Sequence, residues 1–174
     1  MEYFILALIN RAGLTSMYEF QHAAGLQPGG IAPAIRRLET LGFLSRGASS
    51  RRRRRELSVT PEGEQFLTSS FLQCLHDYPD LESVLRAACV ALLMGKADFA
   101  GQYLDDLAER RRKSAEERSM DAERFGKTHR DPLSTYAWMR ALCEAQRRGT
   151  ESKTFSSLGQ FLKEKHRPDG VNPG

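Results

Sequence analysis

The chain has 174 residues, of which 40% are hydrophobic and 28% charged, with a net charge of +4. This composition is typical of soluble globular proteins and excludes an intrinsically disordered chain, while the length allows one large domain or two small ones. The apolar run from Tyr3 to Ile9 has seven residues and an acidic flank, so it is too short to span a membrane and makes a poor signal peptide. We therefore expect a soluble, cytoplasmic protein without a membrane partner.

The amino-terminal residues predict two helices. The segment from Glu2 to Arg11 is apolar almost all round, which favours a buried helix, and Gly13 is placed to end it. Thr15 or Ser16 can cap a second, short helix, and Gly25 is placed to stop that one. Each helix therefore has a start or stop signal of its own.

A third helix is predicted to begin at Pro28, because a proline in the first helical turn removes an N–H group that would have no partner there. Four apolar residues follow at the spacing of one buried helical face: Ile31, Ala34, Ile35 and Leu38. The opposite face carries small residues together with Arg36 and Arg37. Pro33 lies early in this helix, so we expect some distortion there.

A two-stranded hairpin and a fourth helix are expected next. Phe43 to Arg46 and Glu56 to Val59 have the composition of short strands, joined by a loop that starts at Gly47. The sequence Thr60-Pro61-Glu62-Gly63 then resembles a capping residue followed by a proline start. The layout from Glu2 onward is that of a winged helix-turn-helix, with three helices and a two-stranded wing.

The character of the chain changes at Tyr78-Pro79, which breaks the helical pattern. Beyond this point the periodicity predicts only helices, over residues 81–95, 96–124, 133–148 and 155–165. We therefore predict a mainly α protein with a winged helix-turn-helix in residues 1–76, an all-α carboxy-terminal domain in residues 80–167, and a flexible tail in residues 168–174.

Positive charge is concentrated between Pro28 and Thr60. This segment holds eight arginines against Glu39 and Glu56, a balance of +6, so the remainder of the chain carries −2. Five of the arginines are consecutive: Arg51, Arg52, Arg53, Arg54 and Arg55. Adjacent like charges at a hairpin tip repel one another, which favours a polyanion as the partner over a loop that is merely solvated.

No enzyme activity, cofactor or metal is predicted. The histidines are scattered without metal-ligand spacing, and no Gly-x-Ser-x-Gly sequence is present. Gly29-Gly30 lacks the Gly-Lys-Ser/Thr ending of a phosphate-binding loop. The three cysteines form no CxxC pair, so we interpret them as small core residues in a reducing cytosol: Cys74, Cys89 and Cys143.

Several segments, in the right order, resemble the PadR family of bacterial winged-helix regulators. The stretch Gly13-Leu14-Thr15-Ser16-Met17-Tyr18-Glu19-Phe20 is similar to the family's glycine, Tyr-Glu and apolar pattern. Its recognition-helix pattern resembles Pro28-Gly29-Gly30-Ile31-Ala32-Pro33-Ala34-Ile35-Arg36-Arg37-Leu38-Glu39, and its wing and Thr-x-x-Gly resemble the arginine run and Thr60 to Gly63. The resemblance covers residues 1–75 and is weaker after Pro79.

The resemblance implies a homodimeric transcription factor, usually a repressor, that binds double-stranded DNA. Its carboxy-terminal helices would make the dimer, and a small hydrophobic or aromatic effector would release it from DNA. Two positions depart from the family pattern: Ala32 replaces a usual tyrosine and Gly30 a common threonine or serine. The hydroxyl contacts expected at these two positions are therefore missing.

The candidate DNA contacts are Ser16, Tyr18, Gln27, Gly29, Gly30, Ala32, Arg36, Arg37 and the run Arg51 to Arg55. Other roles stay open for several of them. Arg36 can contact a phosphate or match the two acceptors of guanine, or either Arg36 or Arg37 can pair with Glu39 or Thr40 on the same helix. Tyr18 can equally be a half-buried core residue, while Ser16 and Gln27 suit capping and turns.

Trp138, the single tryptophan, lies in the predicted carboxy-terminal domain. It can be a large core or interface residue, or it can line a pocket for a flat effector.

Two other functions stay open for the whole chain. One is a winged-helix module that binds protein or RNA without sequence-specific DNA binding, and the other is a small-molecule sensor with weak, mainly electrostatic DNA affinity.

Overall fold

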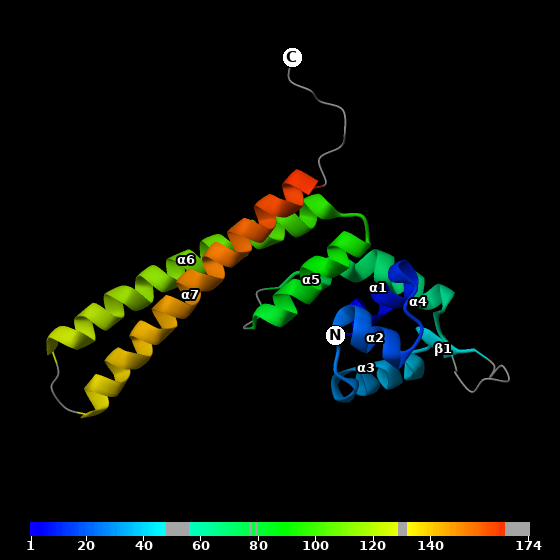
Figure 1. Cartoon of the computed structure of the whole chain (residues 1–174), viewed down its shortest axis with the longest axis horizontal. Coiled ribbons are helices and arrows are strands. Elements are labelled where there is room, and N and C mark those ends of the chain that lie inside the picture. Colours follow the sequence, from blue (N-terminus) through cyan, green and yellow to red (C-terminus); the bar gives the residue numbers. More distant parts are fainter. Residues whose placement is uncertain (48–55, 77, 79, 129–131, 166–174) are drawn as a thin grey trace, which may run out of the picture. The chain divides into compact units, whose positions relative to one another are not determined.

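The computed structural model describes residues 1–47, 56–76, 78, 80–128 and 132–165 (Figure 1). The arginine run and the expected tail 168–174 lie outside these ranges. The described part is mainly helical, with one two-stranded antiparallel sheet, and it divides into two compact units, Met1–Lys96 and Ala97–Gly174. No helix within the described ranges is long and apolar enough to cross a membrane.

Unit 1 contains five α-helices, a short 3-10 helix and both strands among its described residues. In chain order they are α1 (Glu2–Ala12), α2 (Met17–Ala24), α3 (Pro28–Thr40), β1 (Leu44–Arg46), β2 (Leu57–Val59), α4 (Pro61–Ser70), η1 (Phe71–Cys74) and α5 (Leu81–Leu93). This order agrees with the elements expected from the sequence, and both strands begin one residue later than expected.

The helix ends follow the expected local chemistry. Gly13 and Gly25 take the left-handed conformation, with φ of 69° and 63°, and end α1 and α2. Ser16 is the residue that caps α2, and its hydroxyl accepts from the Glu19 N–H group. The Thr60 hydroxyl caps α4 in the same way by accepting from Gly63. These start and stop predictions are confirmed.

The core of unit 1 is built around α1, which packs against α3, α4, α5 and β2. Ile5, Leu6 and Ala7 on α1 are fully buried. The predicted apolar face of α3 is also confirmed, since its four stripe residues are all buried: Ile31, Ala34, Ile35 and Leu38. The helix continues through Pro33 from Pro28 to Thr40.

The two strands pair in antiparallel register, with Leu44 opposite Val59 and Arg46 opposite Leu57. At the base of this ribbon the Phe43 N–H group donates to the Leu38 carbonyl of α3 at 2.9 Å. Because Leu44 and Leu57 are buried while Ser45 is exposed, the ribbon rests on the helical core by one side.

Unit 1 extends beyond the boundary expected at residues 76–80. The helix α5 packs on α1 and buries Val84, Ala88 and Val90, so the compact units divide between Lys96 and Ala97. A helical segment next to a break can pack on either side of it, and periodicity alone does not indicate which side.

Unit 2 contains two long helices, α6 (Ala97–Thr128) and α7 (Pro132–Lys165), which lie side by side (Figure 1). The sequence predicted two separate helices over residues 133–148 and 155–165, and this prediction is wrong. The intervening residues stay helical because they pack on α6: the Ser152 hydroxyl donates to the Ala108 carbonyl at 2.7 Å, and Phe155 is only 1% exposed.

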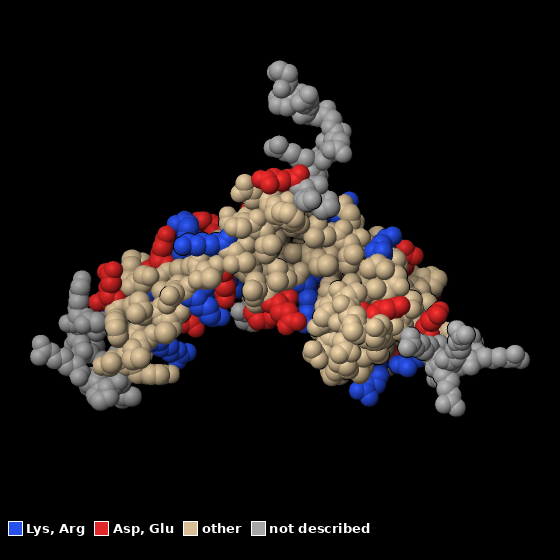
Figure 2. All heavy atoms as spheres, viewed as in Figure 1, with Lys and Arg blue, Asp and Glu red and all other residues tan. Residues whose placement is uncertain are grey.

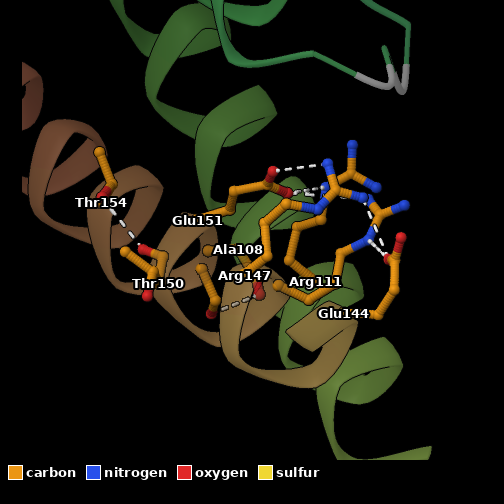
Figure 3. A network of polar contacts seen from close by, with 9 residues as sticks. Ala108, Arg111, Glu144, Arg147, Thr150, Glu151 and Thr154 are labelled. Carbon is orange, nitrogen blue, oxygen red and sulfur yellow. Dashed lines mark hydrogen bonds and ion pairs between the residues drawn. The ribbon is translucent and has the colours of Figure 1, made fainter. Parts of the chain in front are cut away.

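A charged cluster lies in the middle of this helix pair (Figure 3). The Arg111 side chain of α6 is only 7% exposed, and its Nε atom lies 3.2 Å from Oε2 of Glu151 on α7. Arg147 pairs with both Glu144 and Glu151, at 3.1 and 3.4 Å. A buried charge without its partner is costly, so these pairs favour the register that brings Arg111 beside Glu151.

Toward the end of α7 the two helices approach closely at paired glycines. A Cβ on Gly159 would lie 3.4 Å from the Gly101 carbonyl oxygen and would press on the Asp105 carboxylate. Asp105 is itself paired with Lys163 across the two helices. The small residues therefore allow this backbone contact and the ion pair beside it.

Prediction one concerns Gly63, at the start of α4. A Cβ there would overlap the Phe43 carbonyl oxygen and lie 3.0 Å from Cγ1 of Val59. Gly63→Ala is therefore expected to lower the free energy of unfolding by about 1–3 kcal/mol, measured by urea denaturation. Gly30→Ala is the control, because nothing lies within 4 Å of its Cβ and alanine is the better helix former by about 0.5–1 kcal/mol. Equal effects at both positions would contradict this account.

Candidate nucleic-acid interface

The exposed side of α3 can be derived from its buried stripe. Successive residues of an α-helix are about 100° apart around its axis. The side opposite the buried stripe therefore carries residues spaced at i, i+4, i+7 and i+11, which are Gly29, Pro33, Arg36 and Thr40. All four of these residues are exposed, and we call them the outer ridge. The Thr40 hydroxyl donates to the Arg36 carbonyl at 2.9 Å. Arg36 is therefore the long polar side chain of the outer ridge.

The two arginines of α3 have different partners. Arg37 lies on the flank of the helix toward α1, where its Nη1 atom is 2.6 Å from Oε1 of Glu2. The alternative in which Arg37 pairs with Glu39 or Thr40 on the same helix is therefore not found, since this pair joins two helices. Arg36 is exposed, and it has no ion-pair partner among the residues that the structure describes.

The ribbon is tied to the end of α3 by a second charged pair. Arg46, the last residue of β1, donates from Nε and Nη2 to the Glu39 carboxylate, with Nη2 3.1 Å from Oε2. The hydrogen bond with Glu39 raises the pKa of Arg46, so the guanidinium stays charged. A guanidinium and a carboxylate that share two bonds have a defined mutual orientation. The pair therefore fixes the outer end of β1 on α3.

The partner strand is tied to the segment before α2. Leu57, which lies opposite Arg46, donates from its backbone N–H group to the Thr15 carbonyl at 3.1 Å. Thr15 directly precedes the capping residue of α2. The outermost described pair of the ribbon, Arg46 and Leu57, is thus connected to α3 on one strand and to the start of α2 on the other.

The predicted contacts Arg51 to Arg55 lie outside the described residues. The described residues on either side of this gap are held together, because the Gly47 N–H group donates to the Glu56 carbonyl at 2.9 Å. In the chain, the eight residues 48–55 follow Gly47 and precede Glu56.

The start of α2 carries two of the other predicted residues. Ser16 serves as the helix cap, as its alternative interpretation predicted, and its N–H group donates to the Glu19 carboxylate at 2.9 Å. Tyr18 is 58% exposed, so it is not a core residue, and its ring lies against His22 with 4.1 Å between the centroids. The exposed face of α2 therefore presents an aromatic pair.

The remaining predicted residues lie at the start of α3. Gln27 is the exposed N-cap residue, and its side chain makes no capping hydrogen bond. Gly29 and Gly30 are exposed, with nothing within 4 Å of an added Cβ at either position. Ala32 is half-buried on the flank. Of the predicted residues in α3, the outer ridge brings together Gly29 and Arg36, while Gly30, Ala32 and Arg37 lie to its sides.

Sequence reasoning did not find Glu39 and Arg46 as a pair. Helical spacing relates residues three or four apart, and cross-strand pairing relates residues within a sheet. The pair of Glu39 and Arg46 joins a helix to a strand, so neither pattern could reveal it. The only indication of this pair in the sequence is composition, since Glu39 is one of two carboxylates among eight arginines between Pro28 and Thr60.

In unit 2, charges of both signs alternate on the face seen in Figure 2. On α6, Arg112 pairs with Glu109 at 2.8 Å and with Glu116 at 2.6 Å. The Arg112 hydrogen bond lowers the pKa of Glu109 to about 2, so this carboxylate is ionised at neutral pH. These pairs are spaced at i,i+3 and i,i+4, as on a solvated helix, and they do not form a one-sign surface.

Trp138 lies on α7 and is 37% exposed. Its neighbours Tyr136, Met139 and Leu142 are also exposed, at 64%, 53% and 46%. Trp138, Met139 and Leu142 lie within about 100° of one another around the helix, and we call these three residues the apolar face of α7. A hollow of about 370 Å³ between α6 and α7 is lined by Arg118, Asp121, Tyr136, Ala137, Arg140, Ala141 and Glu144. Trp138 is not one of its lining residues, so the predicted effector pocket does not coincide with this hollow.

The cysteines differ in environment. Cys74 is buried, and burial raises the pKa of its thiol to about 11, as expected for an inert core residue. Cys89 is partly buried, and Cys143 is exposed on α7, so the prediction of a core position is wrong for Cys143. In the part of the chain that the structure describes, no three His, Cys, Asp or Glu side chains are grouped to hold a metal ion.

Comparison with protein-family models, with curated proteins and with solved structures finds no match to this chain.

Prediction two concerns the α2 cap. Hydrogen bonds from Thr15 and then from Ser16 lower the pKa of Glu19, so its ionised form stabilises the folded state. This contribution is complete above the ordinary glutamate pKa, about 4.3, and is lost as the pH falls through the lowered folded-state pKa. Glu19→Gln is therefore expected to lower the free energy of unfolding at pH 7 by about 0.5 kcal/mol.

The difference between wild type and Glu19→Gln should disappear in strong acid, as measured by urea denaturation across pH. Glu62→Gln on α4 is a suitable control, because Glu62 is exposed and lies in the first turn of its helix but has no capping-box role. A difference that persists unchanged in strong acid would contradict this assignment.

Proposed function

We propose that the protein is a DNA-binding transcriptional regulator, a homodimeric repressor that a small-molecule effector releases. In this proposal α1 to α3 and the ribbon form a winged helix-turn-helix, and α3 is the recognition helix. The observation that carries the proposal is the double connection of the pair Arg46 and Leu57, to Glu39 of α3 and to Thr15 before α2. In the chain, the five-arginine run lies between Gly47 and Glu56.

Electrostatics supports a nucleic acid as the partner. The arginine run and Arg36 are cations in a segment with a balance of +6, and Arg36 has no ion-pair partner among the described residues. Duplex DNA carries one negative charge for about 1.7 Å of its axis, so a cluster of cations matches its charge density. In this proposal the run binds phosphates and Arg36 enters the major groove.

The two helical glycines also support a close partner. Glycine in a helix is about 0.5–1 kcal/mol less favourable than alanine. Neither Gly29 nor Gly30 has positive φ, and neither has a neighbour within 4 Å that a Cβ would meet. The fold does not require them, whereas a partner that approaches the backbone at the start of α3 would.

The dimer is assigned to unit 2. The apolar face of α7, Trp138, Met139 and Leu142, exposes large apolar side chains along the first half of the helix, while Ala141 and Ala145 are buried against α6. A two-fold dimer that buried this face would present two recognition helices to successive major grooves, about 34 Å apart. The operator would then be palindromic.

An alternative function is binding of protein or RNA without sequence-specific DNA recognition. The outer ridge favours this alternative, because Gly29 and Pro33 have no side chain that can form a hydrogen bond. The Thr40 hydroxyl already donates its proton to the backbone carbonyl of Arg36. Gel shifts with the upstream DNA of the chain's own reading frame and with random duplex, each at two salt concentrations, separate the functions. Preference for the upstream DNA supports the regulator, equal binding supports an electrostatic sensor, and no binding supports the alternative.

Prediction three tests the arginine run. If about four of its arginines contact phosphates, they contribute roughly −3.5 to the slope of log K against log salt, at −0.9 for each contact. Replacing Arg51 to Arg55 by alanine should flatten the measured slope by this amount on random duplex. Replacing Arg110, Arg112 and Lys113 of α6 by alanine is the control, because these cations lie in unit 2. An unchanged slope in the first variant would rule out the run as the phosphate-binding element.

Prediction four tests the dimer. Met139→Glu combined with Leu142→Glu places two charges on the apolar face of α7 and should convert dimers into monomers, as measured by sedimentation velocity. The helix itself should form, because both residues are exposed in the single chain. Gln160→Glu, at an exposed position nearer the end of α7, is the control. A dimer that persists in the double variant would place the interface elsewhere.

A further inference from the structure

A small cavity in unit 1 lies where α1, η1 and α5 meet. Its volume is about 60 Å³, and its apolar wall is formed by Phe4 of α1 together with Ala87 and Val90 of α5. A site for a single water needs about 10–15 Å³, so the cavity has room for about four to six atoms of that size. This is less room than a flat aromatic effector would need.

The polar residues that line the cavity all carry hydrogen-bond donors. One is Arg86 of α5, whose side chain is 23% exposed. The others are Tyr3, Tyr78 and Ser83, which have hydroxyls, and Cys74, which has a thiol. Burial raises the pKa of both tyrosines and of Cys74, so these three groups stay protonated at neutral pH. No carboxylate is among the described residues that line the cavity.

This set of donors matches a small carboxylate. A guanidinium binds a carboxylate by parallel, charge-assisted hydrogen bonds, and hydroxyl groups can donate to the same oxygens. Arg86 already donates from Nη2 to Glu82, a side chain that is 68% exposed. Because a guanidinium carries several N–H donors, it can bind a second carboxylate as well. The apolar wall would then cover a short alkyl group, as in acetate or propionate.

One lining residue connects the cavity to the ribbon. The Tyr3 hydroxyl donates to Oε1 of Gln73 at 3.3 Å, and its ring stacks on Phe66 of α4 with 5.1 Å between the centroids. Phe66 stacks in turn on Phe43, at 4.6 Å. The N–H group of Phe43 is the one that bonds to Leu38 of α3 at the base of the ribbon. Three rings thus form a continuous contact from the cavity to the junction between α3 and β1.

We propose that this cavity is the effector site of the regulator and that it takes a small carboxylate, held by Arg86 and the Tyr3 hydroxyl. This inference rests on the proposed function. When the Tyr3 hydroxyl donates to the carboxylate instead of Gln73, its ring moves relative to Phe66, and the displaced stack alters the junction that positions α3. An effector changes DNA affinity only if it binds the two arrangements unequally, and such couplings are typically about 5–150-fold.

The site is tested without DNA, by following the NMR amide resonances of the full chain while sodium propionate is added. Saturable shifts of the Cys74 and Ala87 amides are expected. Propionamide has nearly the same shape without the charge, so it should bind at least about tenfold more weakly. Benzoate is too large for the cavity and should leave these resonances unchanged. Sodium chloride at the same ionic strength corrects for the effect of salt.

Arg86→Gln removes the guanidinium and should weaken propionate binding at least about tenfold. Arg11→Gln is the matched control, because Arg11 also pairs with an exposed carboxylate, Glu64 at 3.8 Å, but is not among the lining residues. Tyr3→Phe keeps the ring stack and removes the hydroxyl, so it should weaken binding about 2–10-fold. Thermal melting confirms that each variant is folded. Absence of saturable binding by the wild type, or equal binding by Arg86→Gln, would overturn the site.

The effector role is tested with duplex DNA. Saturating propionate should weaken duplex binding by the wild type at least about fivefold, and DNA should weaken propionate binding by the same factor. Phe66→Leu interrupts the ring stack, so it should bind propionate but lose most of this coupling. No coupling in the wild type, or full coupling in Phe66→Leu, would overturn the effector role through the rings. A wild type that binds propionate but no duplex would overturn the proposed function and leave the carboxylate site standing.

Discussion

The burial of α1 is the constraint on which unit 1 depends. A helix that is apolar almost all round must be covered on several sides, and α3, α4, α5 and β2 provide that cover. Each fully buried side chain such as Ile5 or Leu6 contributes about 1.5–3 kcal/mol. Because α3 and β2 both rest on α1, the recognition helix and ribbon of the proposed interface share one base. The same requirement explains why α5 belongs to unit 1, since its apolar side completes the cover.

Above this base, directional polar contacts refine the position of the ribbon. Hydrophobic packing is not directional, so it can hold Leu44 and Leu57 against the core without fixing the outer end of the strands. The bonds of Arg46 to Glu39 and of Leu57 to Thr15 supply that orientation. Charges in unit 2 have a different use, because the buried pair of Arg111 and Glu151 aligns two helices with each other.

Local sequence signals predicted most elements of unit 1. Gly13, Gly25, Ser16 and Thr60 each act through their own backbone or the next turn, which is why their roles could be inferred without knowledge of the fold. Contacts between distant residues could not. The continuity of α7 depends on Ser152 and Phe155 packing on α6, and the partner of Arg37 is Glu2, 35 residues earlier. For the candidate site, the sequence indicated the cations but not the carboxylates that hold two of them.

The bond between Gly47 and Glu56 has a consequence for how such a protein can change over time. With the two ends of the inserted segment pinned together, the entropic cost of a longer insertion grows only with the logarithm of its length, by about 0.6 kcal/mol for each doubling. Descendants could therefore add or delete cationic residues between these anchors at little expense to folding. If the proposed function holds, evolution could tune the affinity for DNA through the number of these cations alone, while the helices and strands of unit 1 stay unchanged.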